Sequence, residues 1–97
     1  MATEFESMYK NEIEEPKMYK VILLNDDYTT MEFVIEVLMK VFKKSLSEAS
    51  TIMLNIHNNG KEVCGVYTYE IAITKSTQVR DMARSSNFPL KAIIQED

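Results

Sequence analysis

Side chains that could do chemistry gather at residues 25–27, where an asparagine and two aspartates follow an apolar stretch. An amide beside two carboxylates can bind a cation or accept several hydrogen bonds. The same residue types also form ordinary turns, in which the side chains bond to their own backbone. The one histidine, His57, could pair with Asp26 and Asp27, or it could be a structural residue of the surface or the core. The residue types alone leave both interpretations open.

Two other pairs of residues could contribute to a site. Met31 and Met53 belong to a set of seven methionines, and methionine lines adaptable apolar pockets as well as ordinary cores. Glu70 and Lys75 bring charges of both signs to one predicted helix, where they are most simply part of a solvated face. The role of these four residues therefore depends on where the helices place them.

The inventory of reactive residues argues against an enzyme. With one cysteine, Cys64, and one histidine, the chain cannot form an internal disulfide and has too few ligands for an ordinary structural zinc site. Its two glycines cannot build a phosphate-binding loop, and no nucleophile setting or cofactor motif is present. We therefore expect no catalysis, no cofactor and no metal. The competing hypothesis is a small metal-dependent hydrolase that uses Asp26, Asp27 and His57.

Length and composition limit the class of protein. The 97 residues allow one domain, and the apolar fraction of 45% excludes a wholly disordered chain. No apolar run approaches the ~20 residues of a transmembrane helix, and the N-terminus lacks the basic and apolar regions of a secretory signal. Together with the single cysteine, these features predict a cytoplasmic protein without a membrane partner. We expect a monomer.

The net charge of −4 lies in the first sixteen residues, which contain five glutamates and one lysine. Residues 17–97 are therefore neutral, and the lack of a basic face argues against nucleic acid as a partner. Residues 1–16 show no sustained periodicity and end at Pro16, so we expect a flexible acidic extension followed by a core domain at 17–97. The extension also contains scattered apolar residues, which fit either a frayed terminus or a segment held by a partner: Phe5, Met8, Tyr9 and Ile13.

The first strand and helix are marked by local signals. An apolar strand at 18–24 stops at the polar turn that follows it. Thr29 with Glu32 three residues later predicts a capping box, and the helix that it begins has apolar residues on one face as far as Phe42. Two lysines then follow, where positive charge suits the end of a helix.

A second helix follows at once. Ser45 and Glu48 predict another capping box, and Gly60 predicts a left-handed C-terminal cap. Between the caps, the spacing places five apolar residues on the inner face: Leu46, Ala49, Ile52, Met53 and Ile56. His57 lies four residues after Met53, so the two share one side of this helix.

The rest of the chain predicts a strand at 62–67, a third helix that begins after Thr68 and stops before Pro89, and a last short strand at 92–94. The order is strand, helix, helix, strand, helix, strand. This order predicts an α+β fold, a small two-layer domain in which a three-stranded sheet packs on three helices.

Four stretches of the sequence together resemble the ClpS adaptors, bacterial and plastid proteins that deliver N-degron substrates to the Clp protease. They are residues 19–34, which include the motif Asn-Asp-Asp-Tyr-Thr, and residues 53–57, 60–66 and 87–90. The motif, with the later Met and His at the expected spacing, is highly specific, and the resemblance covers roughly residues 17–97. It implies an adaptor that binds a free N-terminal Leu, Phe, Tyr or Trp of a substrate. The adaptor would deliver that substrate to a Clp AAA+ unfoldase of the ClpA or ClpC type.

The resemblance implies a role for the polar residues. Asn25 and His57 would bind the free α-amino group, with Asp26 assisting through water or charge, and Asp27 and Thr29 would hold the first peptide unit. An α-ammonium group has three donors, which amide, imidazole and carboxylate acceptors suit. An internal leucine lacks that amine and would leave these acceptors unpaired, at a cost of about 1–3 kcal/mol.

The resemblance also implies which residues line the side-chain pocket: Met31, Val34, Met53 and Leu90. Glu70 and Lys75 would lie on the face that docks the unfoldase, and the unfoldase would engage the acidic extension during delivery. The sequence departs from the family pattern at Thr30, where proline is usual, and at Ile73, where many members have a charged residue. Threonine and proline are both tolerated at the start of a helix, so we expect the loop to be retained.

A third hypothesis is a pure scaffold domain, since similar small α+β folds also occur in ribosomal stalk proteins. The fold alone cannot separate a scaffold from an adaptor, because function depends on the site. Two peptides that differ only in acetylation of the first residue would separate them, since only an adaptor of this kind requires the free amine.

Overall fold

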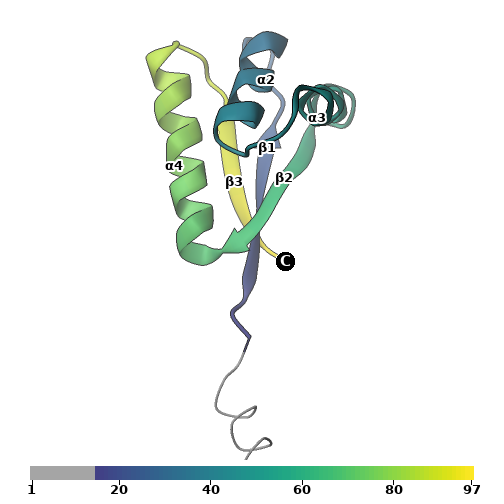
Figure 1. The fold of residues 1–97 in the computed structure, drawn as a ribbon. Coiled ribbons are helices and arrows are strands. Elements are labelled where there is room, and N and C mark those ends of the chain that lie inside the picture. The colour runs from purple at the N-terminus through teal and green to yellow at the C-terminus, as the bar shows by residue number, and fades with distance from the viewer. Residues whose placement is uncertain (1–14) are drawn as a thin grey trace, which may run out of the picture.

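The computed structural model describes residues 15–97, and its six elements follow the predicted order (Figure 1). The strands form one antiparallel sheet in the order β2-β1-β3. The fold is therefore of the predicted α+β class. The acidic extension predicted at 1–16 lies outside the described residues except for its last two positions. The elements are β1 (Met18–Leu24), α2 (Met31–Lys40), α3 (Leu46–Asn59), β2 (Lys61–Thr68), α4 (Tyr69–Ser85) and β3 (Lys91–Glu96).

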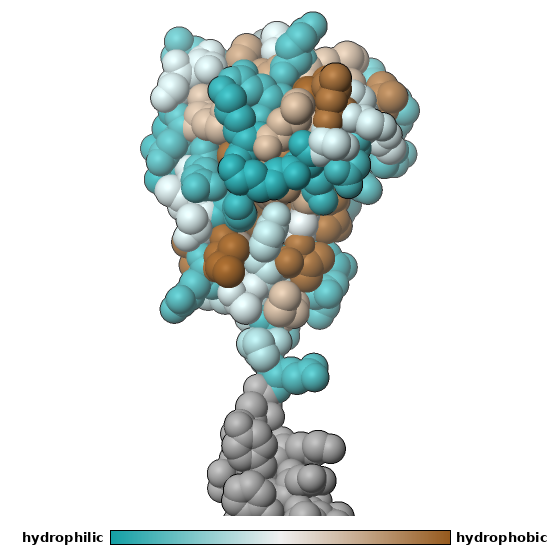
Figure 2. Space-filling model, viewed as in Figure 1, coloured by the Kyte–Doolittle hydropathy of each residue, from teal (hydrophilic) through white to brown (hydrophobic). Residues whose placement is uncertain are grey.

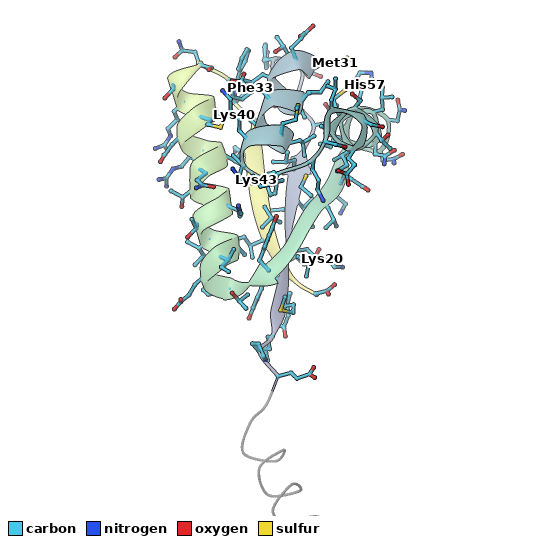
Figure 3. All side chains as sticks on the ribbon, viewed as in Figure 1. Lys20, Met31, Phe33, Lys40, Lys43 and His57 are labelled. Atoms are coloured by element: carbon cyan, nitrogen blue, oxygen red, sulfur yellow. The ribbon has the colours of Figure 1, made fainter. Side chains whose placement is uncertain are left out.

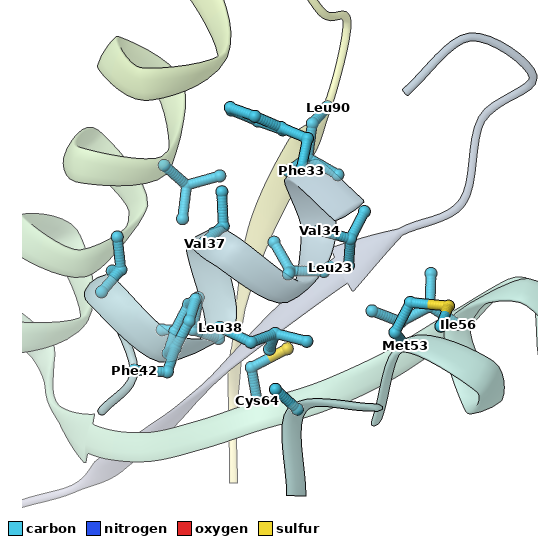
Figure 4. Close-up of a cluster of buried hydrophobic side chains, with 14 of the residues drawn as sticks. Leu23, Phe33, Val34, Val37, Leu38, Phe42, Met53, Ile56, Cys64 and Leu90 are labelled. Atoms are coloured by element: carbon cyan, nitrogen blue, oxygen red, sulfur yellow. The ribbon is translucent and has the colours of Figure 1, made fainter. Parts of the chain in front are cut away.

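The core lies between the sheet and the helices (Figure 4). Val21 and Leu23 of the central strand are fully buried, and they meet Val37 and Leu38 of α2, which are fully buried too. Burial of such a side chain contributes about 1.5–3 kcal/mol. Because β1 is held between two strands and beneath α2, the loop that follows it starts from a fixed position.

A β-bulge interrupts the pairing of β1 with β2. Val21 pairs with Gly65 but Ile22 pairs with Val63, so Cys64 is the extra residue on β2. Its side chain is 1% exposed and belongs to the core. Burial raises the pKa of the Cys64 thiol to about 12. A buried thiol with such a pKa is a structural residue rather than a reactive one.

The start of α2 differs from the prediction. Thr30 is the N-cap, and its Oγ1 accepts a hydrogen bond from the N–H of Phe33 at 3.1 Å. Thr29 lies one residue before the cap, and its N–H and its hydroxyl donate to the Asp26 carboxylate, at 2.6 and 2.7 Å, so its side chain is turned toward the loop. The predicted capping box of Thr29 with Glu32 is therefore wrong by one residue. The departure from proline at position 30 is explained, since threonine is a good N-cap.

The end of α2 also differs from the prediction. The helix ends at Lys40 with Val41 as its C-cap, two residues before the predicted last position, Phe42. Phe42 is nevertheless buried, at 5% exposure, because the chain turns inward there. Lys43 has a φ of 57°, in the left-handed region that terminates helices. Lys75 of α4 joins this end of α2 to the rest of the fold, because its Nζ donates to the Val41 carbonyl at 2.8 Å.

Both predicted caps of α3 are confirmed. Ser45 Oγ accepts from the Glu48 N–H at 3.1 Å, and the Glu48 carboxylate accepts from the Ser45 N–H at 3.0 Å. Gly60 closes the helix with a φ of 87°, and its N–H donates to the Ile56 carbonyl at 2.9 Å. The prediction that Leu46 lies on the inner face is wrong, since its side chain is 60% exposed. As the first helical residue, it points back past the start of the helix into solvent.

The surface mixes polar and apolar residues. Figure 2 shows hydrophilic side chains over much of one face, with separate hydrophobic patches rather than a continuous band. Within residues 15–97, no helix has the length and apolar character needed to cross a membrane.

Candidate functional site

A cavity of about 250 Å³ lies where the loop after β1 meets α2 and the second half of α3. It is smaller than the roughly 300–1,000 Å³ of sites for drug-sized ligands, and its size suits a single side chain. Met31 of α2 and His57 of α3 approach each other at this end of the molecule (Figure 3). The lining consists of Asn25, Asp26, Asp27, Thr29, Met31, Val34, Met53, Ile56 and His57.

One part of the cavity is apolar. Val34, Met53 and Ile56 are 7%, 9% and 2% exposed, so they form a floor that belongs to the core. Met31 is 45% exposed and is the first residue of α2. Because side chains on a helix point toward its N-terminus, Met31 stands at the edge of the cavity instead of beneath it. The alternative that Met31 is an ordinary core residue is therefore not supported.

The loop that forms the polar part is held by Asp26. Its Oδ1 accepts from the N–H groups of Tyr28 and Thr29 at 2.8 and 2.6 Å, and its Oδ2 accepts from the Thr29 hydroxyl at 2.7 Å. Partial burial acts to raise the pKa of Asp26, but these three bonds outweigh it and lower the pKa below the ordinary value of 3.8. Asp26 is therefore a carboxylate at neutral pH, and it gives the loop its shape as well as a negative charge.

A backbone bond fastens the same loop to the end of α3. The Asn25 N–H donates to the Gly60 carbonyl at 2.8 Å, directly beyond the pairing of Leu24 with Lys61. Because Gly60 is the cap of α3, this bond places Asn25 next to the last turn of the helix, which contains His57. Two residues that are 32 positions apart in the sequence therefore line one cavity.

The arrangement combines hydrogen-bond acceptors with an apolar floor. The side chains of Asn25, Asp27 and His57 are exposed, so their oxygen and nitrogen atoms are accessible to a ligand. A cationic donor such as an ammonium group would find an amide oxygen, a carboxylate and an imidazole nitrogen there. No group of three or more His, Cys, Asp or Glu side chains in the described chain is placed to hold a metal ion. The hydrolase hypothesis therefore lacks its metal site in this part of the chain.

Leu90 was predicted to line this pocket and does not, while Glu70 and Lys75 lie on α4, the helix to which the prediction assigned them. Leu90 is 5% exposed and lines a different cavity, between α4 and β3. Glu70 is exposed in the first turn of α4. Lys75 is half-buried, with its Nζ bonded to the Val41 carbonyl and 5.8 Å from the centre of the Tyr67 ring.

Ile56 is a lining residue that the sequence analysis assigned to the inner face of its helix but not to the site. It lies three residues after Met53 and one before His57, so helical spacing puts it between two predicted site residues. That spacing was the available signal.

Comparison with known proteins agrees with this geometry. The family model described as "ATP-dependent Clp protease adaptor protein ClpS" matches residues 14–93. The chain belongs to the ClpS family. The ClpS adapter protein of Campylobacter jejuni (strain RM1221) is 53% identical over 92 residues, which cover 95% of this chain and 96% of that protein. The ClpS adapter protein of Wolinella succinogenes is 53% identical over 96 residues, which cover 97% and 94%.

A solved structure extends the comparison to the fold. This ClpS superimposes on Agrobacterium tumefaciens ClpS2 bound to L-phenylalaninamide with a TM-score of 0.83 and 40% identity. The match covers 86% of this chain and all of that chain. The chain therefore belongs to a family of adaptor proteins of the ATP-dependent Clp protease and has the fold of a solved member of that family.

Proposed function

We propose that this ClpS binds the free N-terminal residue of its substrates in the 250 Å³ cavity and delivers them to a Clp AAA+ unfoldase in the cytoplasm. The observation that supports this most directly is the meeting of accessible acceptors with an apolar floor of single-side-chain size. The first residue of a peptide has an ammonium group and a side chain on the same carbon. It can therefore contact the polar acceptors and the apolar floor of the cavity at the same time.

In this proposal the α-amino group donates to Asn25 and His57. Asp26 contributes through its negative charge or a bridging water, because its direct bonds are already made to Tyr28 and Thr29. Asp27 and the Thr29 oxygen hold the first peptide unit. The bound state of the structural neighbour supports this assignment, since L-phenylalaninamide has a free α-amino group, an amide and an aromatic side chain.

The first side chain enters the apolar part of the same cavity. Val34 and Met53 line it and Ile56 forms its floor, while Met31 stands at the edge. Leu90 supports the packed layer from its position in the core. Burial of a Leu or Phe side chain there contributes about 1.5–3 kcal/mol. Tyr and Trp would be accepted for the same reason, with their polar atoms toward the mouth.

The experiment that tests this function compares two peptides that begin with Phe and differ only in acetylation of the first residue. Free peptide should bind, and acetylated peptide should bind at least about tenfold more weakly, since a lost charged hydrogen bond costs about 1.5–3 kcal/mol. Asn25→Ala should weaken the free peptide alone. Asn58→Ala, at an exposed helical residue that does not line the cavity, is the control and should bind as wild type. Equal binding of both peptides would disprove N-terminal recognition.

Delivery is proposed to use other parts of the chain. Glu70 and Lys75 contribute to the face that docks a ClpA- or ClpC-type unfoldase, with Glu70 exposed and Lys75 presenting the donors that Val41 does not use. The unfoldase engages the acidic residues 1–16. Removal of these residues should leave peptide binding unchanged, because the residues found to line the cavity within 15–97 all lie beyond them, and should block degradation of a reporter that begins with Phe. Degradation at the full rate would remove the extension from delivery.

A further inference from the structure

A second cavity, of about 430 Å³, lies between the C-terminal half of α4 and the start of β3. It shares no lining residue with the site described above. Figure 1 shows α4 and β3 side by side along this region. The floor of the groove is apolar, with Leu90 buried and with Phe88 and Ala92 half-buried. It therefore offers an apolar surface that the described residues leave partly open.

The rim of the groove is basic. Arg80, Arg84 and Lys91 line it, and none of the lining residues within 15–97 is acidic. Of these three cations, Arg80 contacts the Asp81 carboxylate at 3.3 Å, while Arg84 and Lys91 form no salt bridge within residues 15–97. Because residues 17–97 are neutral as a whole, three positive charges around one groove are a local concentration. The groove thus suits an acidic segment that also contains large apolar side chains.

The edge of the sheet is open on this side. Within the part of the chain that the structure describes, β3 pairs only with β1 and lies at the edge of the sheet. An edge strand presents backbone N–H and C=O groups that can pair with an extended segment. An extended occupant could therefore use backbone bonds in addition to charge.

The chain itself contains a segment with the complementary composition. Residues 1–14 contain four glutamates and one lysine, with apolar residues among them. The glutamates match the basic rim of the groove, and the apolar residues match its floor. The four apolar residues are Phe5, Met8, Tyr9 and Ile13.

The segment is long enough to reach the groove. Met18 begins β1, and Ile93 pairs with Ile22 only four residues further along, a distance of about 13 Å at 3.3 Å per residue. A dozen extended residues span up to about 40 Å. Tethering gives a segment an effective concentration on the order of millimolar, so even weak contacts would be populated.

We propose that residues 1–14 of this chain occupy the groove between α4 and β3, with their glutamates against Arg80, Arg84 and Lys91 and their apolar side chains against Phe88 and Ala92. The contact is intramolecular and salt-sensitive, because exposed charges are screened. An unfoldase that engages the acidic segment must therefore first displace it from the groove.

The experiment places a nitroxide spin label on the segment of the full-length chain. Thr3→Cys supplies the labelling site, since Cys64 is 1% exposed and does not compete for the reagent. In the ¹⁵N spectrum, the amides of Arg80, Arg84 and Lys91 should lose more intensity, relative to the same sample with its label reduced, than the amide of Glu48. Glu48 lies in the first turn of α3, which packs on α2 and β2. The loss should disappear at about 0.5 M NaCl, where the Debye length is only a few ångströms.

Two matched variants test the role of charge. Arg80→Glu with Arg84→Glu should abolish the loss of intensity, and the milder Arg80→Gln with Arg84→Gln should reduce it. Lys43→Glu with Lys61→Glu makes the same change of charge at exposed residues outside the groove and should leave it unchanged.

Three results would overturn the proposal. The first is no loss of intensity at the groove, and the second is an equal loss in the charge-reversed variant. The third is an equal loss in a mixture of spin-labelled protein without ¹⁵N and ¹⁵N-enriched protein without the label, where only contacts between molecules can act. The last result would assign the groove to a second copy of the chain.

Discussion

Replacing Met31 by alanine should let this ClpS bind peptides that begin with Ile or Val, while peptides that begin with Leu or Phe still bind. Met31 stands at the edge of the cavity, close to the expected position of the Cβ of a bound first residue. Leu and Phe have a CH₂ at that carbon. Val and Ile are branched there and stiff about χ1, so they cannot turn the extra methyl group away from the Met31 side chain.

The structure sets the size of the expected effects. One misplaced methyl group against a pocket wall costs about 1–3 kcal/mol, or roughly 10–200-fold in binding. A fully buried Met→Ala change lowers stability by about 2–5 kcal/mol. Met31 is 45% exposed, so its loss should cost about 1–2 kcal/mol, which is small beside the 5–15 kcal/mol of an ordinary domain. The variant should therefore remain folded, and its selectivity can be measured.

The assay titrates four peptides, beginning with Leu, Phe, Ile and Val, against wild type and Met31→Ala by fluorescence anisotropy. Met39→Ala is the matched control, because Met39 is on the same helix, is 39% exposed and does not line the cavity. In Met31→Ala the ratio of branched to unbranched affinities should rise at least about tenfold. Met39→Ala should keep the wild-type ratios. If all four peptides weaken alike in Met31→Ala, Met31 has only a structural role.

Three further predictions concern individual side chains. His57→Ala should lose most of the peptide affinity, because it removes an imidazole acceptor for the ammonium group. Wild-type affinity in this variant would exclude His57 from the amine site. Because the pKa of Asp26 is lowered in the folded protein, its ionised side chain contributes stability above pH 3.8, and this contribution is lost as the pH falls further. Urea unfolding should therefore show that acid destabilises Asp26→Asn less than wild type below about pH 4. An identical pH dependence of the unfolding free energy in the two proteins would contradict this. Burial raises the pKa of the Cys64 thiol from 9.0 to about 12. Iodoacetamide at pH 8 should therefore modify Cys64 far more slowly in the native protein than in the urea-unfolded protein, as followed by mass spectrometry. Equal rates would show that the thiol is accessible in the native protein.

Short-range signals in the sequence were sufficient for most of the fold. The capping box of Ser45 with Glu48 and the glycine cap at Gly60 involve residues within four positions of their partners, and both are confirmed. The strand predicted at 18–24 has the observed bounds of β1. The caps could be predicted because the atoms that stabilise them are neighbours in the chain. The strand could be predicted from its apolar run, although its partners β2 and β3 are distant in sequence.

The cap of α2 shows where local signals were ambiguous. Thr29 and Thr30 are adjacent, and either hydroxyl could cap a helix. The choice depends on Asp26, whose carboxylate takes both donors of Thr29 and leaves Thr30 as the cap. The bulge at Cys64 is a similar case, because the extra residue is defined only by the partner strand.

The sequence by itself determined most of the composition of the site, since the resemblance to ClpS adaptors named every lining residue of the cavity except Ile56. It also named Leu90, which lines another cavity. Only the tertiary structure decided where the lining residues meet. The pairing of β1 with β2 and the bond from the Asn25 N–H to the Gly60 carbonyl bring Asn25 next to His57. The start of α2 leaves Met31 half-exposed at the cavity edge, and the packing of α4 against β3 draws Leu90 to another cavity. Contacts between distant segments depend on the packing of whole elements, which no local pattern of residues specifies.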